Sequence, residues 1–282
     1  MSELSVPPKL AHIKKTLAAW GAGLLKSLPI AGLLARSEIA HKWKSLFRSM
    51  SLREAVAWRA HDLLSQSILL YETSNVLGAR ILLRSAFESV AILIYLNQLT
   101  RKVLAGTLNF HEWSEKTSVL LLGSRDKSTP HSAINILSIL QKCDQRYPGI
   151  VELYMKLSES AHPNYEGTSV GYSDIDHKNY VTKFSNKWER MYRRTHLDGV
   201  ELCMITFEME YNAEWQDAFE KLEKWIIEND AVLEATKRGS GNQNIAQRVS
   251  HTKAGREGKT DDPFRTFSEW NSEADTKGYG KL

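Results

Sequence analysis

The stretch "GARILLRSAFESVAILIYL", residues 78–96, decides the fold, because it is apolar over most of its length and still carries three charged residues. A helical residue turns by about 100°, so Arg80, Arg84 and Glu88 would fall within about 80° of one another on a helix. The rest of that helix is apolar, which is typical of a helix buried nearly all round. We therefore expect the charged stripe to face a polar cleft, a subunit interface or buried partners.

Two interpretations of this charged stripe remain open from the sequence. A buried charge without a partner costs several kcal/mol. The stripe could therefore be an internal network in which Arg84 and Glu88 pair along the helix and fix how it docks. Alternatively, it lines a polar pocket between helices, where arginine binds an anion such as phosphate and Glu88 orients it.

Helical spacing of apolar residues continues along most of the chain, and no segment shows sustained two-residue alternation. Ser51 and Glu54 have the spacing of a capping box, which predicts that a helix begins there. The segment 164–180 contains two glycines and no period, so it is expected to be a loop. The sequence thus predicts an all-α bundle at residues 51–236, with helices at about 51–75, 79–99, 111–122, 131–146, 149–161 and 187–237.

The two ends of the chain differ from this bundle in charge. Residues 1–50 contain eight basic and two acidic residues, which predicts a flexible, basic, amphipathic N-terminal arm. Contact of this arm with a membrane surface is the alternative, because Lys9, Lys14 and Lys15 suit anionic headgroups. Residues 237–282 are polar and poor in aliphatic side chains, as disordered tails are. Within 263–282, three aromatic residues predict either a motif that docks a protein partner or a short helix that packs back: Phe264, Phe267 and Trp270.

Bulk composition excludes several classes of protein. Residues 51–236 contain 20 basic and 25 acidic residues, which argues against a strong binder of duplex nucleic acid. Cys143 and Cys203 are 60 positions apart, which excludes a paired-cysteine metal site and a disulfide framework. Such cysteine usage fits a reducing cytoplasm, where we expect the protein to be located.

A second candidate feature is "YMKLSESAHPNYEG", residues 154–167, in which His162 ends a predicted helix before Pro163. A histidine there is either a capping residue or a general acid or base near neutral pH. The nearby acidic residues and histidines match no known metal-ligand spacing, so they are expected to be solvated loop charges. We therefore expect neither a metal nor a cofactor.

The two features together, R-x3-E in an apolar run and S-x3-H-P about seventy residues later, resemble an uncharacterised bacterial group of all-helical proteins. That group is similar to the HEPN superfamily, helical domains of toxin–antitoxin, abortive-infection and antiviral systems. The resemblance covers about residues 52–175, and the tail "FSEWNSEADTKGY" also looks like a segment of small bacterial toxin–antitoxin proteins. It implies a HEPN-like homodimer in a toxin or defence system that acts on RNA or a nucleotide.

Many HEPN proteins are ribonucleases with an arginine placed four to six residues before a histidine. Before His162 the matching window holds Lys156 and no arginine, which puts ribonuclease activity in doubt because lysine cannot form the same planar phosphate clamp. Three other pairs have the spacing, which chance alone would produce once or twice: Arg36–His41, Arg125–His131 and Arg190–His196.

If the resemblance extends to chemistry, it implies His162, Arg84 and Glu88 as catalytic residues and Arg80, Arg84 and Lys156 as phosphate-binding residues. The alternative function is a non-catalytic helical module that dimerises and docks a partner through its tail. The acidic bundle and the missing arginine favour this alternative.

Overall fold

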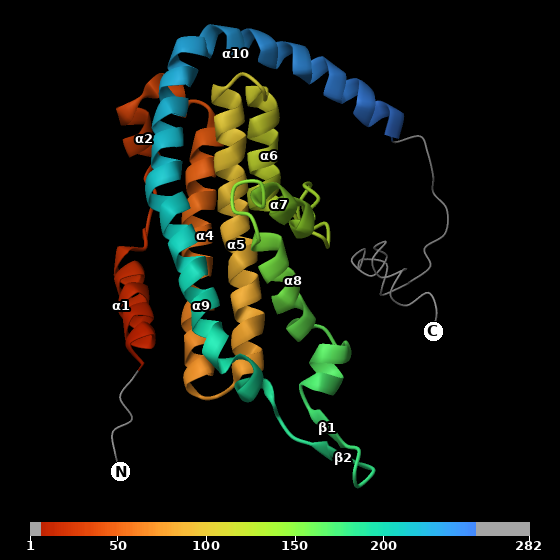
Figure 1. The fold of residues 1–282 in the computed structure, drawn as a ribbon. Coiled ribbons are helices and arrows are strands. Elements are labelled where there is room, and N and C mark those ends of the chain that lie inside the picture. The colour runs from red at the N-terminus through yellow and green to blue at the C-terminus, as the bar shows by residue number, and fades with distance from the viewer. Residues whose placement is uncertain (1–6, 252–282) are drawn as a thin grey trace.

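The computed structural model describes the backbone of residues 7–251 and the side chains of residues 7–237. This part of the chain is mostly helical, and one short hairpin interrupts the helices (Figure 1). The elements in chain order are α1 (Pro8–Gly23), α2 (Ile30–Arg36), α3 (Glu38–His41), α4 (Lys44–Glu72), α5 (Val76–Leu104), α6 (Phe110–Leu122), α7 (Ile136–Cys143), α8 (Ile150–Ala161), the π-helical turn η1 (Tyr165–Val170), β1 (Ser173–Asp176), β2 (Val181–Phe184), α9 (Trp188–Glu208), the π-helical turn η2 (Met209–Glu214) and α10 (Trp215–His251).

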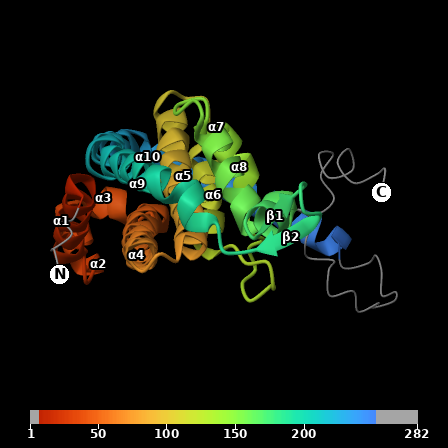
Figure 2. The ribbon, with the colours of Figure 1, turned by 60° about the horizontal axis from the view of Figure 1, so that its bottom comes forward.

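Helix α5 is the centre of the bundle, as the opening stretch of sequence predicts. It packs against α4, α6, α7, α8, α9 and α10 (Figure 2). Most of its large apolar side chains, among them Leu83, Phe87 and Leu93, are almost completely buried, whereas Ile81 is 37% exposed. The prediction of a helix buried nearly all round is confirmed, and so are the helices expected at 111–122 and 149–161, which are α6 and α8.

Helix α4 corrects the predicted capping box. The helix begins at Lys44, so Ser51 lies inside it and does not cap its start. Residues 44–50 continue the apolar face, and their Leu46 is buried. The helix therefore begins seven residues before Ser51. The Glu54 carboxylate accepts hydrogen bonds from Arg53 and from the hydroxyl of Tyr211, and plays no part in capping.

The N-terminal arm is also folded where a flexible segment was predicted, so that prediction is wrong for helix α1. Leu10, Ile13 and Leu17 lie one turn apart and are buried against α4 and α9. Lys9 forms an ion pair with Asp198, and Lys14 forms one with Glu72 across 2.8 Å. None of the helices within residues 7–251 has the length and apolar character that a membrane crossing requires.

The predicted loop at 164–180 contains the start of an antiparallel hairpin. Strands β1 and β2 pair Ser173 with Phe184, and Figure 1 shows the hairpin projecting beyond the ends of α8 and α9. Its base is anchored by Lys187, whose Nζ donates to the Ser173 carbonyl across 2.6 Å and to Asp174 across 2.9 Å. Each strand has only four residues and neither alternates between buried and exposed positions, so no two-residue pattern marks them in the sequence.

Two further boundaries differ from the predictions. Helix α7 begins at Ile136, after Asn135 accepts a hydrogen bond from the Leu137 amide, and not near residue 131. The backbone of α10 continues to His251, beyond the change of composition at Arg238. The predicted docking motif at 263–282 lies outside the described residues.

Candidate functional site

The charged stripe of α5 faces helix α8, and Arg80 is its most buried member, with 6% of its surface exposed. Its Nε donates to Ser160 Oγ across 2.8 Å and its Nη2 donates to the Lys156 carbonyl across 3.1 Å. The guanidinium also lies 3.6 Å from the centre of the Tyr192 ring. Burial lowers the pKa of Arg80. Because protein groups satisfy it, this arginine serves mainly to join α5, α8 and α9.

One turn further along α5, Arg84 is held by three groups. Its Nε donates to Ser158 Oγ across 2.9 Å, and its Nη2 donates to the Tyr154 hydroxyl across 2.5 Å. The same Nη2 lies 3.4 Å from Glu88 Oε1, which accepts a hydrogen bond from Tyr154 across 2.9 Å. Burial and the neighbouring Glu88 carboxylate raise the pKa of Tyr154 to about 12, so its hydroxyl remains a neutral donor.

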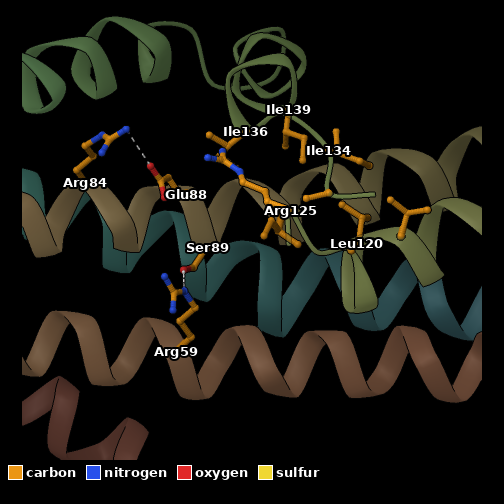
Figure 3. Close-up of a pocket in the computed structure, with 13 residues that line it drawn as sticks. Arg59, Arg84, Glu88, Ser89, Leu120, Arg125, Ile134, Ile136 and Ile139 are labelled. Atoms are coloured by element: carbon orange, nitrogen blue, oxygen red, sulfur yellow. Dashed lines mark hydrogen bonds and ion pairs between the residues drawn. The ribbon is translucent and has the colours of Figure 1, made fainter. Parts of the chain in front are cut away.

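Arg84 and Glu88 also line a pocket of about 450 Å³, shown in Figure 3. Four parts of the chain form its walls: α4, α5, the region from α6 through the segment that follows it, and α7. The lining residues are Arg59, Arg84, Glu88, Ser89, Ile92, Val119, Leu120, Gly123, Arg125, Ala133, Ile134, Ile136 and Ile139. The stripe is therefore both an internal network and the rim of a pocket, which joins the two interpretations left open by the sequence.

The pocket lining is positively charged. It contains three guanidinium groups and one carboxylate, that of Glu88. Arg59 donates from Nε to Ser89 Oγ across 3.2 Å and, among residues 7–237, forms no ion pair with a carboxylate. A guanidinium bonded only to a neutral hydroxyl keeps most of its donors available for an anion.

The sequence did not point to Arg59, and it marked Arg125 only as a member of the Arg125–His131 pair, whose spacing chance alone would produce. Arg59 stands on an exposed part of α4 and Arg125 in the segment between α6 and α7, and neither belongs to a charged repeat. Helix packing alone brings them beside Arg84. Apart from the Arg125–His131 spacing, the sequence marks Arg125 only as a basic residue that follows a predicted helix, and both signals are too common to be specific.

The structure separates the remaining predicted site residues from the pocket. His162 is the C-cap of α8, and its backbone N–H donates to the Ser158 carbonyl across 3.1 Å. Its imidazole is exposed, does not line the pocket and has no hydrogen-bond partner among the described side chains. Lys156 is exposed on α8 and pairs with Glu152 across 2.6 Å. Of the predicted residues, the pocket thus gathers Arg84 and Glu88 but not Arg80, Lys156 or His162.

The three other arginine–histidine pairs have different surroundings. The exposed Arg36 and the buried His41 both bind the buried Glu223 carboxylate, with His41 Nε2 at 2.7 Å. Arg190 is exposed, whereas His196 is buried against Ser67 Oγ at 3.1 Å. In the third pair, Arg125 lines the pocket, whereas His131 Nδ1 lies 3.5 Å from the Glu115 carboxylate.

A second charged cluster surrounds Glu210 in the π-helical turn η2. Its side chain has no exposed surface and accepts hydrogen bonds at 2.7 Å from Asn97 Nδ2, Arg146 Nε and the Tyr147 hydroxyl. Burial and the bond to Glu210 raise the pKa of Tyr147 to about 12. Three donors satisfy this carboxylate, so the cluster joins η2, α5 and the segment between α7 and α8.

Within residues 7–237, no three histidine, cysteine or acidic side chains come together as metal ligands would. No protein-family model matches the chain, and no curated protein or solved structure is significantly similar to it.

Proposed function

We propose that the protein binds a phosphate-bearing ligand in the pocket between α4, α5, α6 and α7. The observation that carries this proposal is the convergence of Arg59, Arg84 and Arg125 on one pocket whose lining has a single carboxylate. Arg59 in particular donates to the neutral Ser89 hydroxyl, so its guanidinium keeps donors for such an anion. Guanidinium groups are the side chains best suited to bind phosphate through paired hydrogen bonds.

Within this site the arginines have different tasks. Arg84 is fixed by Ser158 and Tyr154, so it presents a rigid positive group and loses little conformational freedom on binding. Arg59 is less restrained and can turn its terminal nitrogens toward the anion. Glu88 holds Arg84 and Tyr154 in place, and it repels a ligand group of like charge.

The wider proposal, from the sequence resemblance, is a HEPN-like toxin or defence component that acts on RNA or a nucleotide. Arg84 would contact a phosphate there, and His162 would transfer a proton. Because His162 lies outside the pocket lining, this role requires a substrate that extends to the exposed end of α8, or a second copy of the chain.

The alternative function is a non-catalytic module that docks a partner. The observation that favours it is the hairpin, whose Tyr180 and Phe184 are 95% and 80% exposed and whose Ile175 and Val181 are also exposed. Apolar side chains gathered on a projecting element are typical of interaction surfaces.

Isothermal titration calorimetry with inorganic phosphate tests the proposed binding. Wild-type protein is expected to bind phosphate, and Arg59→Gln should weaken binding by roughly tenfold or more, the loss typical of one charge-assisted hydrogen bond. Arg194→Gln is the matched control, because Arg194 is exposed and does not line the pocket. Equal affinities for wild type and both variants would overturn the proposal.

A further inference from the structure

We infer that the ligand of this pocket is amphiphilic, with a phosphate head group and an unbranched aliphatic chain. The inference rests on the proposed function and adds the chemical class of the ligand. It comes from the distribution of charged and aliphatic side chains over the pocket walls.

The pocket has a charged end and an aliphatic end. Along α5, Arg84 and Glu88 come first and Ile92 follows two turns after Arg84, a rise of about 12 Å. Figure 3 shows the same order, with Arg84, Glu88 and Arg59 at one side and Leu120, Ile134 and Ile139 at the other. Arg125 lies between the two ends in that view. A ligand that fills the pocket would therefore place its anionic group and its apolar group apart.

The apolar residues that line the pocket are all aliphatic. They number seven: Ile92, Val119, Leu120, Ala133, Ile134, Ile136 and Ile139. Within the described part of the chain, the lining includes no aromatic ring. Sites for nucleobases commonly stack the base on an aromatic side chain. An aliphatic chain suits this wall better than a base does, because it needs apolar contact and no stacking partner.

One short segment supplies both kinds of lining residue. The segment between α6 and α7 contributes the charged Arg125 and the aliphatic Ala133 and Ile134. Its ends are tied together, since the Ser124 amide donates to the His131 carbonyl across 2.9 Å and the Ala133 amide donates to the Ser124 carbonyl across 3.2 Å.

Glycine is required where this segment leaves α6. A Cβ atom at Gly123 would lie 2.5 Å from the Val119 carbonyl oxygen and 2.9 Å from Ala133 Cα. Both contacts are with backbone atoms, which cannot move aside as a flexible side chain can. Glycine therefore allows the segment to lie close against the end of α6 at the pocket wall.

The size of the pocket also fits a small amphiphile. Its volume of about 450 Å³ falls within the range of roughly 300–1,000 Å³ that is usual for small-molecule sites. Four separate parts of the chain border this space, which stays partly open to solvent.

Calorimetric titration with butyl, hexyl and octyl phosphate tests the inference, all below their micelle-forming concentrations. Inorganic phosphate, adenosine 5′-monophosphate and hexanol are the comparison probes. Each added methylene should tighten binding by up to about fourfold, the fold-change that corresponds to about 0.8 kcal/mol. Hexyl phosphate should bind more tightly than adenosine monophosphate, and hexanol should bind more weakly than hexyl phosphate.

Two variants separate the ends of the pocket. Ile134→Ser, at a half-buried position, should reduce the dependence of affinity on chain length. Arg59→Gln should weaken binding of every phosphate and leave the dependence on chain length intact.

The outcomes distinguish the inference from the proposed function. If inorganic phosphate and all alkyl phosphates bind equally, or adenosine monophosphate binds most tightly, the amphiphile inference is overturned and phosphate binding stands. If no phosphate binds, both fall. Affinity that rises with chain length and depends on both Arg59 and Ile134 supports both.

Discussion

Arg84 of α5 donates a hydrogen bond from Nε to the hydroxyl of Ser158 on α8, across 2.9 Å. Arg84 also lines the pocket, so one residue connects the interface between α5 and α8 to the candidate site. The serine that the sequence places four residues before His162 thus orients the arginine, while the histidine caps the helix beyond it. This relationship makes the position of Arg84 dependent on the docking of α8.

Tyr154→Phe should destabilise the fold modestly and loosen Arg84. The hydroxyl accepts from Arg84 and donates to Glu88, and removal of such bonds to charged groups costs about 1 to 3 kcal/mol. Chemical denaturation measures the change in the free energy of unfolding. Tyr172→Phe is the control, because Tyr172 lies at the base of the hairpin and outside the pocket lining. A neutral effect of Tyr154→Phe would show that Arg84 does not depend on this hydroxyl.

Arg80→Met should cost more than any substitution of an exposed arginine. It removes a buried cation that donates to Ser160 and to the Lys156 carbonyl, and it leaves both acceptors without this donor. The expected loss is about 2 to 4 kcal/mol, to be measured by denaturant unfolding. Arg194→Met, which alters an exposed side chain, should change stability by less than about 0.5 kcal/mol. Similar values for the two variants would contradict a structural role for Arg80.

Stability should fall in mild acid because of His196. Burial, with a smaller contribution from Arg80, lowers the pKa of His196 from 6.5 to about 4. The unfolded chain therefore takes up a proton at His196 before the folded chain does, so stability is lost as the pH falls from about 6.5 to about 4. A shift of this size corresponds to a loss of about 3 kcal/mol.

The matched variant for this pH effect is His196→Gln, which keeps a polar group near Ser67 but does not titrate. Thermal melts of wild type and variant between pH 7.5 and 4.5 should converge as the pH falls, because only the wild type carries this contribution. Parallel curves over that interval would show that His196 is not responsible for the acid sensitivity.

A growth assay tests the wider proposal of a toxin. Expression of the wild-type chain alone in bacteria should slow growth if it cleaves RNA, and His162→Ala and Arg84→Ala should each relieve the effect. Loss of a general acid or base lowers a rate by roughly a hundredfold or more. His177→Ala is the control, since His177 lies between the hairpin strands and is exposed. Harmless wild-type protein, or an equally toxic His162→Ala variant, would favour the docking module.

The sequence alone determined the central helix and its surroundings. The period of apolar residues in 78–96 is decided by the backbone geometry of a helix, so α5 and its burial could be predicted without any partner. Helices α6 and α8 were predicted for the same reason. The shared stripe of Arg80, Arg84 and Glu88 was predicted as well, because three residues at four-residue spacing must lie on one side.

Which of those charges meets solvent was decided only by the tertiary structure. Arg80 and Arg84 are equivalent in the sequence, yet Arg80 is enclosed by α8 and α9 whereas Arg84 borders the pocket. Arg59 and Arg125 join the site from segments 25 or more residues away from Arg84, and no local pattern encodes that distance. The capping box at Ser51 failed for a related reason: burial of Leu46 stabilises a longer helix than the local cap would allow. Local periodicity fixes a helix and its faces, but the packing of several helices determines which face becomes a site, because burial depends on residues that are distant in the chain.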